Sequence, residues 1–472
     1  MTTSAGMTAR RRQFLIFLVA GTFFMEMLDA TVIVTALPSM ATSFHRNAVD
    51  LNVAMTAYLL TLGVFIPVSG WVAERFGPKT VYGSAIVLFT VSSLLCAMSP
   101  TLPAFIAARI LQGIGGAMMV PVGRLIVLRV TPKPELMRAT ATIVWPGLIA
   151  PVLGPPIGAF LTTYLSWPWI FYLNLPLGAI AFLLALRLAP AKGDEQHRPL
   201  DWLGAILSGA ATVALAYGLD LLSNETVSPA LVVALIVCGL ILGVICVRHM
   251  RRHRHPLINL SVMGHQTFSF SMFAGSLCRI AIGTAPFLLP LMFQIGMGFS
   301  AIRSGTLVLA VFAGNLAMKS ITTPMLRRFG FRSILVFNGI LSAVSIALCG
   351  ALSPDTPTAV IVILLFASGL FRSMQFTGLS TIAFADVPQP MMGGANALMS
   401  TVMQLTLGMG VAVGAVLLRG SAWFRGGSVG TPDLMDFRFA FVAAGVIALI
   451  GALGALPLPH TAGAEVSGHR RV

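Results

Sequence analysis

Fourteen apolar runs constrain this chain more than any other feature of its sequence. Each run is about 20 residues long, enough for an α-helix to cross the hydrocarbon core of a bilayer. Across the 472 residues, hydrophobic side chains make up 57% and charged side chains only 10%. A soluble domain carries roughly 25% charged residues, so the sequence predicts an all-α polytopic membrane protein. The runs cover residues 14–36, 52–72, 79–98, 102–122, 139–163, 169–188, 201–222, 229–247, 267–293, 301–323, 333–352, 357–380, 394–418 and 438–457.

The basic residues gather on one side of the predicted membrane. If the N-terminus lies in the cytoplasm, the loops and tails on that side hold 21 of the 30 Lys and Arg residues, and the opposite loops hold 4. Cytoplasmic loops of membrane proteins collect Lys and Arg in this way. We therefore expect a multi-pass protein of the cytoplasmic (inner) membrane with both termini in the cytoplasm. The same placement explains the net charge of +15 without a nucleic-acid partner.

A short motif recurs in the two halves of the chain. Residues 74–79 read ERFGPK and residues 327–332 read RRFGFR, at an offset of 253 residues. This offset exceeds half the chain, as expected if two helices are inserted between two six-helix halves. Parallel six-helix repeats are a transporter arrangement. We predict a first bundle over residues 1–190, two inserted helices with a cytoplasmic loop over residues 191–265, and a second bundle over residues 266–472.

Two acids lie inside the first apolar run. Glu26 and Asp29 are three residues apart, so they share one face of a helix. A charged residue at a helix centre costs roughly 2.5–3.5 kcal/mol on insertion scales. Arg109 and Gln112, on one face of the fourth run, offer a partner for an acid. The pattern fits either a structural ion pair that holds helices together or a proton- or cation-binding site facing a water-filled cavity.

Glycine and proline mark the fifth run, which reads WPGLIAPVLGPPIGAFL from residue 145. Small residues at helical spacing let another helix approach closely, and proline removes hydrogen bonds from the backbone ladder. We expect a kinked helix that packs closely and pivots, with simple packing as the alternative. Gly147, Pro151, Gly154 and Gly158 form one face of this predicted antiporter helix, and Pro155 interrupts its backbone ladder.

Taken together, the motifs resemble those of the major facilitator superfamily, in its fourteen-helix group of drug:proton antiporters. Residues 28–38, LDATVIVTALP, resemble that group's first-helix signature, and residues 109–117, RILQGIGGA, resemble the fourth-helix motif of proton-coupled members. Residues 153–158, LGPPIG, resemble the fifth-helix antiporter motif, although Ala159 replaces a usual Gly. Residues 166–178, SWPWIFYLNLPLG, resemble the next signature, with Pro168 where Arg is common.

The loop from Gly70 to Tyr82, GWVAERFGPKTVY, resembles the superfamily's gating-loop motif. Glu74 stands where that motif usually has Asp, and Pro78 stands where it usually has a basic residue. Because the acid is retained, we expect the gating role to survive. The resemblance assigns this role to Gly70, Glu74, Arg75, Gly77 and Lys79.

The resemblance implies a proton-coupled exporter of small lipophilic or cationic compounds, working by alternating access without a cofactor. Asp29 would be the proton-linked acid and Arg109 its partner, while Glu26 would help to select cations. The expected partners are a small-molecule substrate, protons and the lipid bilayer. Periplasmic or outer-membrane efflux partners stay open, as does the alternative of a metabolite uniporter or symporter of the same fold. No cluster such as HExxH and no GxxxxGK[ST] motif is present, so we expect neither an enzyme nor an ATP-driven pump.

The later helices offer fewer motifs. Asn396, Ser400 and Gln404 recur every fourth residue, a stripe that fits either a transport pathway or interhelical hydrogen bonding. Three basic residues in or near apolar runs stay without a role and would favour anionic substrates if they faced a cavity: Arg279, Lys319 and Arg372. The run HMRRHRH, residues 249–255, contains no acid or thiol, and its arginines would repel a cation, so we expect no metal site there.

Overall fold

The computed structural model describes residues 7–46, 51–190, 199–221, 228–424 and 432–467. Every regular element in these ranges is a helix, and twelve helices are long and apolar enough to cross a membrane. The bounds in the first part of the chain are α1 (Ala9–Phe44), α2 (Asn52–Phe76), α3 (Pro78–Ala97), α4 (Leu102–Val130), α5 (Leu136–Tyr164), α6 (Trp169–Tyr172), α7 (Asn174–Leu188), α8 (Trp202–Leu221) and α9 (Pro229–Arg252). The later bounds are α10 (Gln266–Leu291), a π-helical turn at Met292–Gly296, α11 (Ala301–Cys349), α12 (Thr358–Ile382), α13 (Met392–Phe424), α14 (Leu434–Leu453) and α15 (Ala464–Ser467). Three 3₁₀ turns lie at Lys133–Glu135, Leu260–Gly264 and Gln389–Met391.

The predicted count of fourteen spans is compatible with these helices. The 49 residues of α11 contain non-helical backbone at Gly330, so α11 consists of two helices. The 29 residues of α5 form one helix of membrane-spanning length, in addition to the twelve. The prolines of α5 do not interrupt the helix, because nearby groups in spanning helices can hydrogen-bond to the backbone carbonyls that proline leaves without a partner.

The repeated Arg-Phe-Gly motif marks the same turn in both halves. Gly77 ends α2 with φ 82°, and Gly330 divides α11 with φ 73°. Glycine adopts positive φ at little steric cost, whereas a residue with a Cβ is disfavoured there. Each motif therefore lets one helix follow another almost directly, and the sequence repeat corresponds to a structural one.

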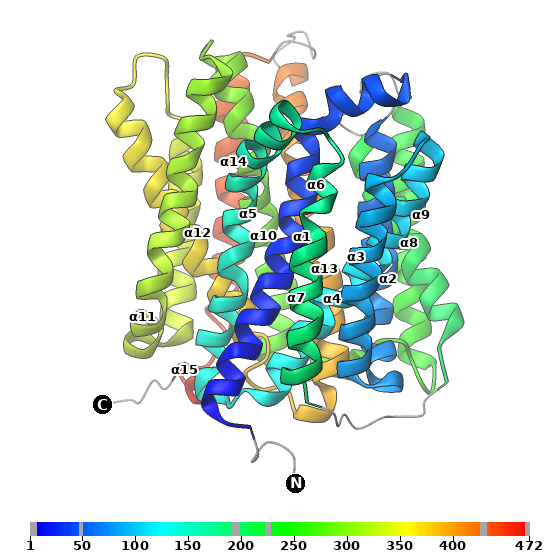
Figure 1. Cartoon of the computed structure of the whole chain (residues 1–472). Coiled ribbons are helices and arrows are strands. Elements are labelled where there is room, and N and C mark those ends of the chain that lie inside the picture. Colours follow the sequence, from blue (N-terminus) through cyan, green and yellow to red (C-terminus); the bar gives the residue numbers. More distant parts are fainter. Residues whose placement is uncertain (1–6, 47–50, 191–198, 222–227, 425–431, 468–472) are drawn as a thin grey trace.

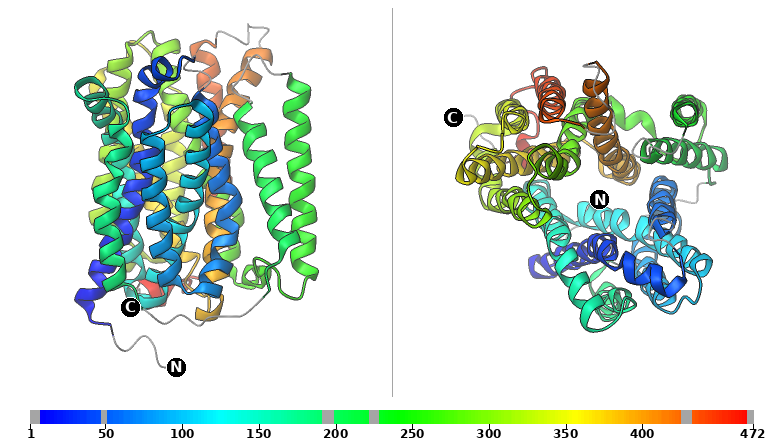
Figure 2. Two further views of the ribbon diagram at one scale, coloured as in Figure 1. Left: turned by 45° about the vertical axis from the view of Figure 1, so that its right-hand side comes forward. Right: turned by 90° about the horizontal axis from the view of Figure 1, so that it is seen from above.

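The helices run side by side along one direction, and the described chain begins and ends at the same end of the molecule (Figure 1). We call this the basic end, because Lys133 lies there, paired with Glu465 of α15 (Figure 1). The pair α8 and α9 stands at the periphery (Figure 2), where α8 packs against α2 and α13. On another side of the molecule, α5 packs against α11. These contacts, together with the direct packing of α2 on α13, join the first six-helix group to the second.

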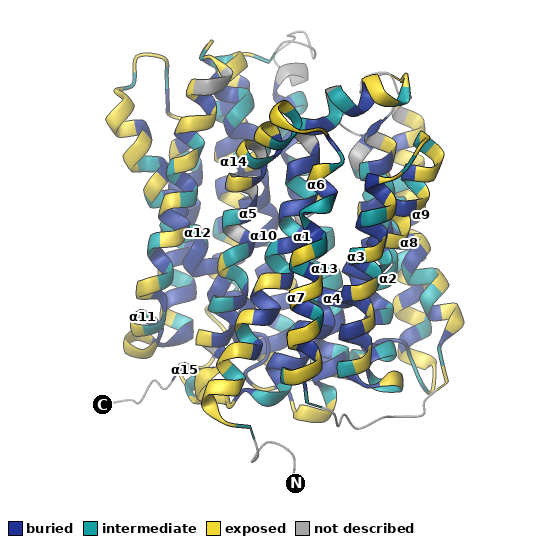
Figure 3. Cartoon of the chain, in the orientation of Figure 1, coloured by how far each residue is buried: buried dark blue, intermediate teal, exposed yellow. Residues whose placement is uncertain are grey.

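Buried and exposed faces are divided as expected for helices in lipid. Interior-facing surfaces are buried and outward-facing surfaces are exposed over much of the helix length (Figure 3). On α9, large apolar side chains such as Val233, Leu240 and Val244 are more than half exposed. Lipid solvates such side chains, so the outward apolar surface does not need a protein partner.

The two halves touch near the basic end. Asn396 Nδ2 on α13 donates to the Pro121 carbonyl of α4 at 2.8 Å, and Lys133 Nζ lies 2.7 Å from Glu465 Oε2. Arg124 Nη1 lies 3.6 Å from Met403 Sδ. The bundles are therefore linked by polar contacts toward this end.

Candidate functional site

The carboxylate of Asp29 lies at the centre of a buried polar network in the first bundle. Arg109 Nη1 donates to Asp29 Oδ2 at 2.7 Å. Gln112 Nε2 and Asn174 Nδ2 donate to Asp29 Oδ1 at 3.0 and 2.8 Å. All four side chains are at most 4% exposed. The charge of Asp29 is therefore balanced by one cation and shared among helices α1, α4 and α7.

A second layer holds these donors in place. Ser93 Oγ on α3 accepts from Gln112 Nε2 at 2.8 Å and from Asn174 Nδ2 at 3.2 Å. Gln112 Oε1 accepts from Arg109 Nη1 at 2.6 Å. The Arg109 guanidinium lies 4.2 Å from the ring centroid of Tyr58, close enough for a cation–π contact. Protonation of Asp29 would neutralise the carboxylate that accepts from these three donors, and would weaken the link between the helices.

Glu26 lies one turn from Asp29 but in a different environment. Its Oε2 atom is buried without a hydrogen-bond partner, and so is the Tyr58 hydroxyl. Both groups flank Gly116, where a Cβ would lie 3.6 Å from Glu26 Cδ and 3.4 Å from Tyr58 Oη. No basic group forms an ion pair with Glu26 in the described part of the chain. A carboxylate buried in this way is costly to keep ionised, so Glu26 is suited to carry a proton.

The predicted gating-loop residues lie where α2, α3 and α13 meet. Gly77 forms the turn, and Gly70 and Glu74 lie against the first turn of α13. A Cβ on Gly70 would lie 3.2 Å from the Gly393 carbonyl oxygen, and a Cβ on Gly393 would collide with Glu74 Oε1. The loop therefore contacts the second bundle directly. Arg75 and Lys79 are partly buried on either side of the Gly77 turn.

The glycine stripe of α5 packs on α1. A Cβ on Gly147 would collide with the Phe23 ring, and one on Gly154 would lie 2.8 Å from Thr31 Cβ. A Cβ on Gly158 would lie 2.7 Å from the Val32 carbonyl oxygen. These glycines hold α5 against the helix that carries both acids. The side chains of Pro151 and Pro155, assigned to the same predicted helix, lie outside the described residues.

The polar stripe of α13 divides in two. Asn396 is 2% exposed and bonds across the two bundles to Pro121, as interhelical hydrogen bonding predicts. Ser400 and Gln404, one and two turns further, are partly exposed. The stripe therefore begins in a contact between the bundles and continues on a more open face.

Basic residues of the second bundle are held by neutral groups. Arg279 is 1% exposed and donates to the carbonyl and hydroxyl of Ser271, at 2.8 and 2.9 Å. Lys319 Nζ lies 2.6 Å from Thr377 Oγ1. Arg372 on α12 is partly buried. No ion pair of any of the three with an acid occurs among the described residues.

One expectation about the histidine run changes in three dimensions. Asp201, distant in sequence, meets His249 and His253, and the potential ligand atoms of the three lie within 4.8 Å of one another. An acid therefore does stand beside this run. Burial opposes ionisation of Asp201, but hydrogen bonds from Gly204 N, His249 and Leu257 N lower its pKa below the ordinary value.

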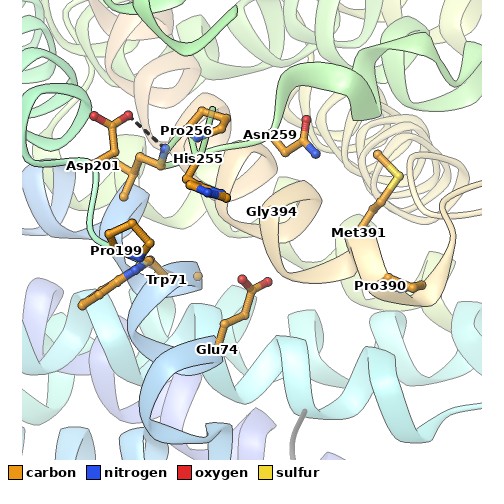
Figure 4. A pocket seen from close by; sticks show the side chains of 12 residues that line it. Trp71, Glu74, Pro199, Asp201, His255, Pro256, Asn259, Pro390, Met391 and Gly394 are labelled. Atoms are coloured by element: carbon orange, nitrogen blue, oxygen red, sulfur yellow. Dashed lines mark hydrogen bonds between the residues drawn. The ribbon is translucent and has the colours of Figure 1, made fainter. Parts of the chain in front are cut away.

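These bonds give Asp201 a structural role. It caps the start of α8 and ties α8 to α9 and to the segment after α9. Asp201 also borders a cavity of about 130 Å³ beside Trp71 and Glu74 (Figure 4). The inserted helices are thus attached next to the predicted gating loop.

Three members of the site were not predicted from the sequence. Asn174 lies within a recognised signature, but nothing there signals that it bonds to Asp29. Ser93 and Tyr58 lie in apolar runs without a distinguishing pattern. Only the packing of α2, α3 and α7 around Asp29 reveals them.

Known proteins resemble the chain over most of its length. The model of the Major Facilitator Superfamily matches residues 19–411. A protein of Pectobacterium carotovorum named multidrug resistance protein MdtD is 39% identical over 403 residues, covering 85% of this chain and 86% of that protein. An Escherichia coli protein of the same name is 36% identical over 407 residues, covering 85% of each chain.

Two solved structures share the fold at low sequence identity. The human organic anion transporter MFSD10 has a TM-score of 0.66 at 15% identity, covering 95% of this chain and 100% of that one. The proton:xylose symporter XylE has a TM-score of 0.66 at 14% identity, covering 97% and 98%. This chain is therefore a multi-pass membrane transporter that belongs to the major facilitator superfamily.

Proposed function

We propose that the chain is a proton-coupled antiporter that exports small lipophilic compounds across the cytoplasmic membrane. The observation that carries this proposal is the Asp29 carboxylate, buried against Arg109, Gln112 and Asn174 and one turn from the unpartnered Glu26. Ionisable groups within spanning helices commonly mark proton or ion pathways. The multidrug resistance name of the relatives supports export of drug-like compounds.

Protonation couples to conformation through the network around Asp29. An ionised Asp29 holds α1, α4 and α7 together through three donors. A protonated Asp29 keeps a weaker set of hydrogen bonds, so the two protonation states favour different packings of these helices. The glycines of α5 lie directly on α1, so a change in the packing of α1 is transmitted to α5. Helix α5 in turn contacts α11 of the second bundle.

Transport then follows alternating access. We place the basic end in the cytoplasm, on the strength of its Lys and Arg residues. With that end closed, Asp29 and Glu26 take protons from the outside and substrate leaves; with it open, protons leave and substrate enters. A membrane potential supplies about 2.3 kcal/mol per charge per 100 mV, enough to drive accumulation against a gradient.

The test uses purified protein in vesicles with an imposed pH gradient. Two fluorescent amphiphiles serve as probes, the cation ethidium and the anion anilinonaphthalene sulfonate, with a trapped pH indicator to report proton movement. The wild type should move at least one probe against its gradient, with protons moving the opposite way. Asp29→Asn should abolish gradient-driven transport while exchange of labelled for unlabelled probe continues.

A second variant and a protonophore separate the alternatives. Glu26→Gln should change the ratio of protons to probe, because it removes one buried carboxyl group without disturbing the Arg109 pair. Transport that persists at the wild-type rate after the gradient is collapsed would favour the uniporter alternative. Wild-type coupling in Asp29→Asn would remove Asp29 from the mechanism.

A further inference from the structure

A large cavity lies between the two bundles, away from the Asp29 network. Its volume is about 990 Å³, within the range of small-molecule sites, and residues of α1, α5 and α11 line it. Aromatic and aliphatic side chains form much of the wall: Phe17, Phe24, Trp145 and Leu153. Three basic side chains complete it: Arg138, Lys319 and Arg327. None of the described lining residues is acidic.

The basic residues of this cavity extend inward from the basic end of the molecule. Lys319, Thr323 and Arg327 follow at four-residue spacing, so they share one face of α11. Arg138 begins α5 at the same end of the molecule. Lys319 lies about 12 Å along the helix from Arg327, at 1.5 Å per residue, so positive charge extends from the basic end into the membrane-spanning part.

Lys319 is the unusual member. Its ammonium carries three donor hydrogens, and the one hydrogen bond seen for it goes to the neutral Thr377 hydroxyl. A cation placed within a spanning segment normally pairs with an acid or faces a polar cavity. Glu26 is not available, because its carboxyl group faces Gly116 of α4. Lys319 therefore lines a cavity in which no described lining residue supplies an opposing charge.

The apolar wall of the cavity is partly exposed. Phe17 is 53% exposed, Trp145 is 42% exposed and Leu153 is 40% exposed. Leu153 lies more than two turns deeper along α5 than Trp145. A molecule with an acyl or aromatic body therefore fits along this wall while its head group stays near the basic residues.

We propose that this cavity binds single-chain amphiphiles with an anionic head, entering from the inner leaflet between α5 and α11. The head group is a sulfonate, carboxylate or phosphate held by Lys319, with Arg138 adding positive charge toward the basic end, and the apolar body lies against Phe24 and Trp145. The inference rests on the proposed export function and names its substrate class. It also departs from the cationic substrates that the resemblance implied. The same head chemistry can come from a membrane lipid or from a dissolved amphiphile.

The binding test uses three ligands with one tail and different heads. Labelled decanesulfonate, decanol and decyltrimethylammonium are titrated against purified full-length protein in zwitterionic lipid nanodiscs. The wild type should bind the sulfonate most tightly. Lys319→Gln should weaken sulfonate binding roughly tenfold, as expected for loss of a charge-assisted hydrogen bond, and leave decanol unchanged. Lys319→Arg should restore most of the sulfonate affinity.

A matched control lies on the same helix. Arg328 precedes the Gly330 turn beside Arg327 but does not line the cavity, so Arg328→Gln should leave sulfonate binding unchanged. Equal affinity for the sulfonate and the ammonium in the wild type would overturn the proposal. So would unchanged sulfonate binding in Lys319→Gln.

A lipid arm identifies the source of the ligand. Adding phosphatidylglycerol to the nanodiscs should weaken sulfonate binding in the wild type if anionic lipid occupies the site, and leave it unchanged if the ligand is a dissolved amphiphile. Both results are consistent with a ligand that has an anionic head group.

In transport assays, Lys319→Gln should lower export of anilinonaphthalene sulfonate, and should not change the passive leak of this probe across the membrane. If no probe is exported by the wild type but sulfonate binding still needs Lys319, the export function fails and the site stands. If export occurs and Lys319 has no effect on sulfonate binding, the site fails alone.

Discussion

The two bundles hold buried cations by different means. In the first, Arg109 pairs with Asp29 at 2.7 Å, and both side chains are 1% exposed. In the second, Arg279 and Lys319 bond to hydroxyl and carbonyl groups, and helices α10 to α13 contain no Asp or Glu. An acid can take up a proton and release its cation, whereas a carbonyl cannot. If the chain is the proton-coupled exporter proposed above, the comparison places proton coupling in the first bundle, and leaves Lys319 of the second, which pairs with no described acid, available to substrate.

The largest expected effect comes from removing Arg109. Arg109→Ala leaves Asp29 buried without its cation, which should cost about 3–5 kcal/mol of stability. The measurement is the midpoint of thermal unfolding in detergent, with membrane insertion checked separately. The double variant Asp29→Asn with Arg109→Gln should recover much of that loss but not proton-driven transport. A wild-type midpoint for Arg109→Ala would mean that the pair is not structurally important.

Helix packing should respond alike in both bundles. Gly154→Ala places a Cβ against Thr31 of α1, and Gly410→Ala places one 2.6 Å from Gly283 Cα of α10. Overpacking of this kind costs about 1–3 kcal/mol, so both variants should unfold at lower temperature. Gly408→Ala is the control, because a Cβ there meets nothing within 4 Å. A loss confined to one bundle would show that the close packing matters unequally.

Removing the buried cation of the second bundle should have a smaller effect of opposite sign. Arg279→Met keeps much of the side-chain volume and leaves no charged partner behind, because Arg279 bonds to Ser271 and not to an acid. We expect the stability to be unchanged or to rise by about 1 kcal/mol. Thermal unfolding beside Arg109→Ala gives the direct comparison. Losses of equal size in the two variants would contradict the distinction drawn between the bundles.

The smallest effect is expected where the bundles meet at the surface. Lys133 and Glu465 form an ion pair at 2.7 Å with side chains 45% and 75% exposed, so it contributes little. The Lys133 ammonium lowers the pKa of Glu465, so this contact is complete at neutral pH and is lost as pH falls through the acidic range. Labelling of a cysteine introduced at the basic end reports how open that end is. In the wild type this labelling should rise slightly as pH falls, and Lys133→Gln should raise it slightly at neutral pH and remove its dependence on acid. An unchanged acid response in the variant would assign it to other groups.

Much of the fold could be predicted from the sequence, because a bilayer requires long apolar helices with internally satisfied backbones. The apolar runs predict the helices to within several residues, although α1 extends well past the predicted 14–36 to Phe44. The sixth run instead divides into α6 and α7. These ends depend on local caps and turns, such as the Thr8 hydroxyl that accepts from Arg11 N, which hydropathy does not register. The division into domains at residues 190 and 265 stays a prediction.

The candidate site was predictable in part. Asp29, Arg109 and Gln112 stand out because a charged or polar group inside an apolar run needs an explanation. Asn174 and Ser93 do not, because a small polar residue near a helix end or among other hydroxyls is ordinary. No acid lies near the histidine run in the sequence, but one lies near it in the structure. Asp201 contacts His249 because α8 packs on α9.

By itself, the sequence determined that the chain crosses the membrane many times, that basic residues favour one side, and that Glu26 and Asp29 share a helix face. These features follow from transfer free energies and helical periodicity, which act locally along the chain. Only the tertiary structure decided that, among the described residues, Asp29 pairs with a cation while Glu26 does not, and that none of the described residues lining the cavity beside Lys319 is acidic. Those outcomes depend on which helices pack together, because pairing and solvation of a charge are set by neighbours distant in sequence.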